Sequence, residues 1–292
     1  MALNADRIRK NVRKLGKVLK KARKRPNPEV VHGLRTHARR FESLVDALSL
    51  DSKANERRLL KRVKRIRKSA GKVRDLDVLT SDLGELHVKG EQNCLVILFE
   101  YLGARRHKHA ARLVRSIERD KAVILKRMKK TSRRIDKLLG SNGQTSSQNR
   151  AMEDAMASAM ARASELATPG NLTRGNLHEY RLKIKELEDV LQMSDDEGHA
   201  KFVEALDKVK DAIGEWHDWE ELIGIAVKIL DHGPSCKLLH ELRVVSSRKY
   251  ESALTLANKL RKNYLKLADS SSGAARSRPG QPVIKAVSKI AA

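Results

Sequence analysis

Aromatic residues and cysteines are scarce in this chain of 292 residues. Phe, Trp and Tyr together make up 3% of the sequence, so its hydrophobic core must be built from aliphatic side chains. This scarcity also argues against a protein that stacks the bases of single-stranded nucleic acid on aromatic rings. The only cysteines, Cys94 and Cys236, are no disulfide framework, which favours a reducing, intracellular location.

Long apolar runs and catalytic signatures are missing as well. No segment approaches the roughly 20 apolar residues of a membrane span, and the N-terminal residues lack the apolar region of a secretory signal. We therefore expect a cytoplasmic protein without a membrane span. The sequence also contains no G-x-x-x-x-G-K-[ST] phosphate loop and no nucleophile elbow. We accordingly expect no enzymatic activity and no cofactor.

Positive charge is what the chain has in excess. It contains 62 Lys and Arg residues against 36 Asp and Glu residues, a formal net charge of +26. So large an imbalance bears on partners rather than on fold. It predicts a polyanionic partner: nucleic acid, an acidic membrane surface or a chain of inorganic phosphates.

Apolar residues recur at intervals of three and four, which is the helical period, and no alternating strand pattern occurs. The first such run is Ile8, Val12, Leu15 and Leu19, and Pro26 ends it. The sequence therefore predicts an all-α fold of helical bundles. The further helices are expected at about 28–49, 52–70, from Arg74 onward, 91–139 with a break near 117–121, 177–193, 198–212, 216–231 and 236–267.

A polar segment, GSNGQTSSQN at 140–149, divides the chain. We expect an N-terminal bundle half at 1–140, a linker at 141–150 and a C-terminal bundle half at 151–268. The Ser-, Gly- and Pro-rich segment 269–292 is expected to be a disordered tail.

Two motifs recur in the same order on either side of this linker. The first reads H-x-x-R-x-x-x-[R/K] and occurs twice, 146 residues apart. The second reads G-x-x-x-D-x-[D/E] and occurs twice, 143 residues apart. Because both recur in register, they predict an internal duplication of a unit of about 140 residues. The first motif comprises His32, Arg35 and Arg39, then His178, Arg181 and Lys185; the second comprises Gly71, Asp75 and Asp77, then Gly214, Asp218 and Glu220.

The spacing of the first motif places its charged side chains on one face of a helix. Like charges at such spacing repel each other, so the arrangement favours an anion between them or an acid from a neighbouring helix. Arg binds phosphate through two parallel hydrogen bonds, and His becomes cationic after a small upward pKa shift. The alternative interpretation is a solvated basic face or a salt-bridged bundle interior.

Together these motifs resemble those of the CHAD domains, a family named for a conserved-histidine α-helical domain. The resemblance spans about residues 5–265. It implies two tandem four-helix bundles that arose by internal duplication and are related by a pseudo-twofold axis around a strongly basic central cavity. It also implies that the chain binds inorganic polyphosphate and associates with polyphosphate granules.

On this resemblance, both halves of the chain contribute to polyphosphate binding. The second half departs from the family pattern, because the acidic segment ELEDV follows Lys185 and His217 stands where the first half has Arg74. The candidate polyphosphate-binding residues are His32, Arg35, Arg39, Arg40, Arg74, His178, Arg181 and Lys185.

The acidic residues of the second motif could form a metal or acid–base set, but a structural role is favoured. Each pair follows a glycine that is expected to end a helix, and an Asp near the next helix N-terminus satisfies free N–H groups. These acids could also neutralise and orient the arginines. His107 and His109 lie two residues apart and point to different helix faces, so no metal site is expected.

The sequence thus predicts non-catalytic binding of inorganic polyphosphate. The alternative is a protein that binds RNA or DNA nonspecifically through the phosphate backbone, and some weak nucleic-acid binding is expected from charge alone. No zinc finger, homeodomain pattern or RNP motif supports sequence-specific binding.

Overall fold

The computed structural model describes residues 5–88, 90, 92–139, 146–192, 200–231 and 236–265. All regular structure in these residues is helical, which confirms the all-α prediction. The helices of this part of the chain are α1 (Ala5–Lys24), α2 (Pro28–Ala47), α3 (Ala54–Gly84), α4 (Gln92–Leu139), α5 (Ser146–Ala167), α6 (Leu177–Leu191), α7 (Ala200–Ile229) and α8 (Lys237–Tyr264).

The first two helices form where their sequence predicts. In α1 the apolar stripe from Ile8 to Leu19 is buried, while the basic residues of the other faces remain in solvent. At the start of α2, the Asn27 side chain accepts a hydrogen bond from the Val30 N–H at 3.0 Å. Pro28 follows as the first helical residue, a position that needs no N–H donor.

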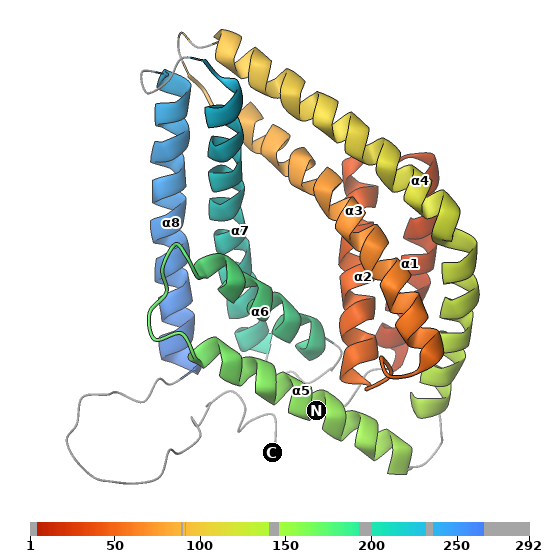
Figure 1. Cartoon of the computed structure of the whole chain (residues 1–292). Coiled ribbons are helices and arrows are strands. Elements are labelled where there is room, and N and C mark those ends of the chain that lie inside the picture. Colours follow the sequence, from red (N-terminus) through yellow and green to blue (C-terminus); the bar gives the residue numbers. More distant parts are fainter. Residues whose placement is uncertain are drawn as a thin grey trace, which may run out of the picture.

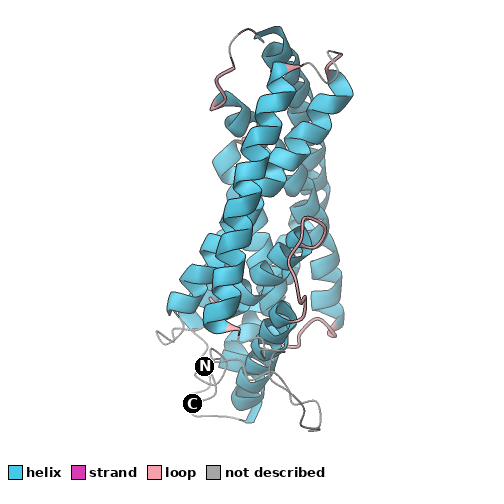
Figure 2. Ribbon diagram, turned by 90° about the vertical axis from the view of Figure 1, so that its left-hand side faces the viewer, coloured by secondary structure: helices cyan, strands magenta, loops and turns pink. Residues whose placement is uncertain are grey.

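Two pairs of long helices set the shape of the molecule. The α7 and α8 helices pack side by side, as do α3 and α4 (Figure 1). Both pairs extend toward the same end, where α3 and α4 contact α7. Seen from the side, the molecule is tall and narrow (Figure 2). The shorter helices, α2, α5 and α6, connect the two pairs at the other end, where α2 packs against α6.

The hydrophobic interior comprises two clusters. The larger one draws buried residues from all the helices named above. The smaller one is built from the second part of α3, the first part of α4, the second part of α7 and the first part of α8. Each long helix therefore passes through both clusters, and neither cluster divides at the predicted linker. The two-bundle duplication and its pseudo-twofold axis stay a prediction.

Three expected helix breaks are absent. The α3 helix runs without interruption through Gly71 and Arg74, and α7 runs through Gly214. The expected break near 117–121 is also wrong, since α4 continues for 48 residues. At that point the Asp120 carboxylate is fully buried and binds Arg62 and Arg65 of α3. These ion pairs hold α4 against α3 where a break was expected.

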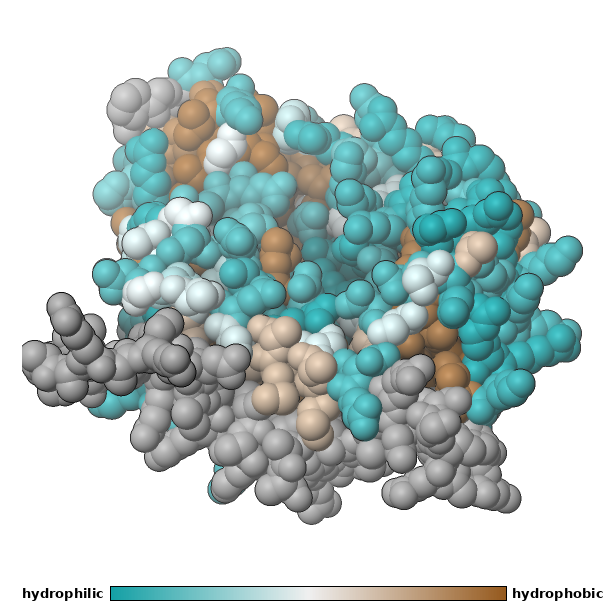
Figure 3. All heavy atoms as spheres, turned by 60° about the horizontal axis from the view of Figure 1, so that its bottom comes forward, coloured by the Kyte–Doolittle hydropathy of each residue, from teal (hydrophilic) through white to brown (hydrophobic). Residues whose placement is uncertain are grey.

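The predicted boundaries lie partly outside the described residues. The α5 helix begins at Ser146, so the last part of the predicted linker is helical, while residues 140–145 and the predicted tail at 269–292 lie outside. Among the described residues, no helix is both long and apolar enough to cross a membrane. One face of the molecule, shown in Figure 3, is mainly hydrophilic.

Candidate functional site

The contact between α2 and α6 brings the two copies of the first motif together. A pocket of about 590 Å³ lies between α2, α3, α6 and α7, and we call it the central pocket. Seven of the eight candidate residues line it: His32, Arg35, Arg39, Arg40, Arg74, Arg181 and Lys185. Residues that are far apart in sequence thus converge on one space, as expected if both motif copies serve one ligand.

The eighth candidate, His178, does not line this pocket. Its imidazole ring stacks on that of His217, with the ring centroids 4.2 Å apart and the planes inclined by 30°. Burial lowers the pKa of His178, and the neighbouring His217 and Arg181 lower it further. This neutral histidine is stacked on His217 of α7 and does not reach the central pocket.

Each glycine of the second motif lies beside an arginine of the first. A Cβ atom at position 71 would lie 3.8 Å from Nε of Arg35, which is an ordinary contact. A Cβ atom at position 214 would lie only 2.7 Å from Cζ of Arg181, which is too close. The Nε of Arg181 also donates to the Lys210 carbonyl oxygen of α7 at 3.1 Å. The two motifs are therefore linked in space, and Gly214 provides the room for Arg181.

The central pocket contains as many carboxylates as cations, seven of each. It is therefore mixed in charge, whereas the family resemblance implies a strongly basic cavity. The cations are Arg35, Arg39, Arg40, Arg74, Arg181, Lys185 and Lys210; the carboxylates are Asp75, Glu188, Asp189, Asp207, Asp211, Glu215 and Asp218.

Cations and carboxylates are unevenly paired within this set. Arg35 binds Asp75 at 2.9 Å, and Lys210 binds Glu188 at 2.9 Å and also contacts Asp207. By contrast, five of the pocket cations form no salt bridge with any described residue: Arg39, Arg40, Arg74, Arg181 and Lys185. Among these, Arg39 and Lys185 are largely enclosed.

The pKa shifts follow from this pairing. Burial lowers the pKa of Lys185 to about 6, with further contributions from Arg181 and Arg39. Burial also lowers the pKa of Arg39, against the opposing effect of Asp189. Asp189 itself has its pKa raised to about 6 by burial, even though Arg39 acts to lower it. An anion bound beside Lys185 would favour its charged form and raise its pKa.

The acids of the second motif lie within helices, not at helix starts. The expected role at an N-terminus is therefore wrong, because Gly71 and Gly214 do not end their helices. Asp75 and Asp218 line the central pocket. Asp77 instead accepts a hydrogen bond from Arg106 at 2.5 Å, and Glu220 accepts one from Arg174 at 3.1 Å. No group of three or more His, Cys, Asp or Glu residues within the described chain could hold a metal ion.

Sequence analysis did not place Lys210 or the carboxylates at 188, 189, 207, 211 and 215 in the site. One signal was present, since the acidic segment after Lys185 contains Glu188 and Asp189. A second signal is the spacing of Asp207, Asp211 and Asp218, which share one face of α7. Which way that face points depends on how α7 packs, so the spacing alone does not assign it to the pocket.

Comparisons with known proteins identify the family and the fold. The chain matches the CHAD domain family over residues 6–226. Its structure is similar to the crystal structure of the CHAD domain from the plant Ricinus communis, with a TM-score of 0.60 and 16% sequence identity over 89% of this chain and 91% of that chain. No match was found among curated proteins. The chain belongs to the CHAD domain family.

Proposed function

We propose that this chain binds inorganic polyphosphate in the central pocket and performs no chemistry on it. The observation that carries the proposal is the convergence of Arg39 and Lys185, from α2 and α6, in a pocket where neither forms a salt bridge with a described residue. The same family resemblance extends the proposal to association with polyphosphate granules. Such granules would present many polyphosphate molecules to each protein molecule.

Binding on this proposal is an exchange of anions. The pocket carboxylates neutralise some of the cations while no ligand is bound, as Asp75 does for Arg35. Phosphate groups on a flexible chain would then compete with these carboxylates for the arginines. Arg offers phosphate a bidentate, charge-assisted contact. Neighbouring phosphates on one chain bind at high effective concentration, so the affinity should rise with chain length until the pocket is filled.

A competition titration tests the proposal. Labelled long-chain polyphosphate is bound at near-physiological salt and then displaced by RNA, duplex DNA or short phosphates. We expect that nucleic acid at equal phosphate concentration does not displace the bound polyphosphate. Displacement by RNA at equal charge would place the nucleic-acid alternative first.

A pair of double variants locates the binding. Arg39→Gln with Lys185→Gln removes two pocket cations, while Lys17→Gln with Lys20→Gln removes two exposed cations of α1. Both variants replace two basic side chains with glutamine. We expect the first to weaken polyphosphate binding by about 10-fold or more and the second by less than about 3-fold. Equal losses would mean that charge is spread over the surface and that no site exists.

One specific observation favours the alternative function, nonspecific nucleic-acid binding. The outer faces of α3 and α4 carry exposed cations that lie around His109 of α4. Lys72 of α3, together with Arg105 and Arg112 of α4, lowers the pKa of His109, after burial as the largest cause. A basic face on two long helices suits a rigid duplex backbone better than the enclosed pocket does.

A further inference from the structure

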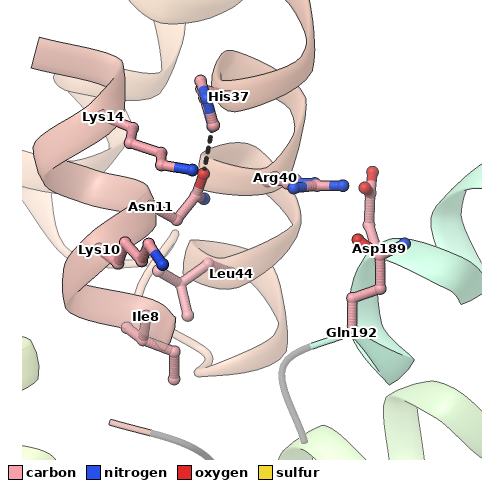
Figure 4. Close-up of a pocket in the computed structure, with 9 residues that line it drawn as sticks. All are labelled: Ile8, Lys10, Asn11, Lys14, His37, Arg40, Leu44, Asp189 and Gln192. Atoms are coloured by element: carbon pink, nitrogen blue, oxygen red, sulfur yellow. Dashed lines mark hydrogen bonds between the residues drawn. The ribbon is translucent and has the colours of Figure 1, made fainter. Parts of the chain in front are cut away.

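A second pocket lies beside the central one, between α1, α2 and the end of α6 (Figure 4). Its volume is about 310 Å³, and we call it the α1–α2 pocket. Its polar lining includes Lys10, Asn11, Lys14, His37, Arg40 and Asp189. Figure 4 shows that two helices supply the basic groups, since Lys10 and Lys14 come from α1 while His37 and Arg40 come from α2.

Positive charge in this pocket is not neutralised by the protein. Three cations, Lys10, Lys14 and Arg40, face a single carboxylate, Asp189. None of the three forms a salt bridge with a described residue, and the Nε atom of Arg40 is buried without a hydrogen-bond partner there. The α1–α2 pocket therefore has an excess of two positive charges, whereas the larger central pocket has equal numbers of both signs.

His37 is fixed in this pocket by a neighbour on α1. Its Nδ1 lies 2.8 Å from Oδ1 of Asn11, so the ring is held with Nδ1–H donating and Nε2 turned away from Asn11 (Figure 4). Burial, with smaller contributions from Arg40 and Lys14, lowers the pKa of His37 to about 4. The histidine is therefore neutral at pH 7, because burial and the surrounding positive charge both oppose its protonation. A bound anion would offset that charge.

The two pockets share part of their lining. Arg40 and Asp189 line both of them. In Figure 4, Arg40 extends from α2 toward Asp189 on α6, at the boundary between the pockets. A thin chain that lies in the central pocket could therefore reach the α1–α2 pocket by passing these two residues.

We infer that the α1–α2 pocket binds a terminal phosphate group of a polyphosphate chain whose body lies in the central pocket. This inference rests on the proposed function. An internal phosphate of such a chain has one ionisable oxygen and carries one negative charge, whereas a terminal phosphate has two ionisable oxygens and, like a phosphorylated side chain, carries about 1.5 to 2 negative charges at neutral pH. The excess of two positive charges in a small, open pocket matches the doubly charged end. The central pocket has equal numbers of basic and acidic side chains and no such excess, which suits the singly charged internal units.

The test compares two polyphosphates of the same length, one with free ends and one with both ends capped as phosphoramidates, so that each capped end keeps a single negative charge. The dissociation constant of each polyphosphate from the full-length protein is measured at one salt concentration. We expect the free-ended chain to bind about 10-fold more tightly, as a charge-assisted contact of one added charge would give. The variant Lys10→Gln with Lys14→Gln should lose this preference, and the control variant Lys17→Gln with Lys20→Gln should keep it.

The outcomes separate this inference from the proposed function. If both polyphosphates bind equally tightly, and the Arg39→Gln with Lys185→Gln variant weakens both, the central pocket stands and the chain-end site is overturned. If neither polyphosphate binds at near-physiological salt, the proposed function itself fails. Inorganic phosphate is the third probe, followed through the NMR signal of His37. If it saturates the pocket while free-ended and blocked chains still bind alike, the pocket takes free phosphate and not a chain end.

Discussion

The guanidinium group of Arg181 packs directly over the backbone of Gly214, where a Cβ atom would lie 2.7 Å from Cζ. The corresponding pair in the first half, Arg35 and Gly71, is looser: a Cβ atom at position 71 would lie 3.8 Å from Nε of Arg35, against 3.0 Å from Nε of Arg181 for one at position 214. This difference makes one glycine essential for the position of its arginine and leaves the other replaceable.

The first prediction follows from this pair. Gly214→Ala should displace Arg181 and break its hydrogen bond to the Lys210 carbonyl group. We expect polyphosphate affinity to fall by about 5- to 10-fold, the loss of one charge-assisted contact. Gly71→Ala is the matched control, since an alanine fits there. It should leave affinity unchanged and stabilise α3 by up to about 1 kcal/mol. Titration and urea unfolding of both variants measure these effects, and equal affinity losses would contradict the argument.

The second prediction concerns pH. Because the pKa of Lys185 is lowered to about 6, this lysine is mostly neutral at pH 7 without a ligand. A bound phosphate chain raises that pKa, so binding takes up a proton. Affinity should therefore rise as the pH falls from about 8 to about 6. Calorimetry in two buffers of different ionisation enthalpy measures the proton uptake.

The control for this experiment is Lys185→Gln, which should flatten the pH dependence in the upper part of that range. The pKa of Asp189 is raised to about 6, so the protonation of this carboxylate changes the affinity only near pH 6. A wild-type affinity that is constant between pH 8 and pH 7 would show that Lys185 does not contact the phosphates.

The third prediction concerns the acids that compete with the ligand. Asp189→Asn should strengthen polyphosphate binding several-fold, because Arg39 and Arg40 would no longer face this carboxylate. The substitution should not destabilise the protein at pH 8. Because folding raises the pKa of Asp189, its negative charge destabilises the folded state at pH values above that pKa. Removing the charge therefore causes no loss of stability at pH 8. Glu204→Gln, an exposed change on α7 with the same charge difference, is the control. Weaker binding by Asp189→Asn would contradict the exchange of anions.

The fourth prediction concerns the junction of α3 and α4. The Asp120 carboxylate is fully buried and receives hydrogen bonds from Arg62, Arg65 and Arg119. Although burial raises the pKa of Asp120, the hydrogen bonds from Arg119 and Arg62 lower it overall. Asp120→Ala should therefore lower the free energy of unfolding by about 1–3 kcal/mol at pH 7.

The sign of the pH effect provides the check. Because folding lowers the pKa of Asp120, its carboxylate stabilises the folded state at pH values above about 4, which is the pKa of an Asp in an unfolded chain. This stabilisation is lost as the pH falls below that value. Urea unfolding of the wild type and Asp120→Ala should thus converge at low pH. Asp6→Ala, at an exposed position of α1, is the control. A constant difference between the wild type and Asp120→Ala at all pH values would mean that the carboxylate contributes by packing only.

Much of the fold could be predicted from the sequence, because the helical period of the apolar residues is strong and prolines are few. The breaks at Gly71 and Gly214 were predicted wrongly for a physical reason. Glycine weakens a helix, but at Gly214 the missing side chain makes room for Arg181 of another helix, and at Gly71 the helix continues although an alanine would also fit. That requirement is tertiary, and it is not visible in the local pattern.

The candidate site could be predicted in part for a similar reason. The spacing of His32, Arg35 and Arg39 already places them on one helix face. For His178 the same spacing was insufficient, because His217 of α7 stacks on its ring. The carboxylates of α7 enter the pocket only through the packing of that helix against α6, so their contribution could not be assigned from the sequence.

The passage of the long helices through both hydrophobic clusters has a consequence for dividing the molecule. The smaller cluster takes Leu79 and Leu98 from one side of the polar segment at 140–149, and Leu222 and Leu242 from the other. If the chain were cut there and the fragments produced separately, each would expose half of this cluster to water. We expect such fragments to aggregate alone and to regain polyphosphate binding only when they are produced together, as a split protein.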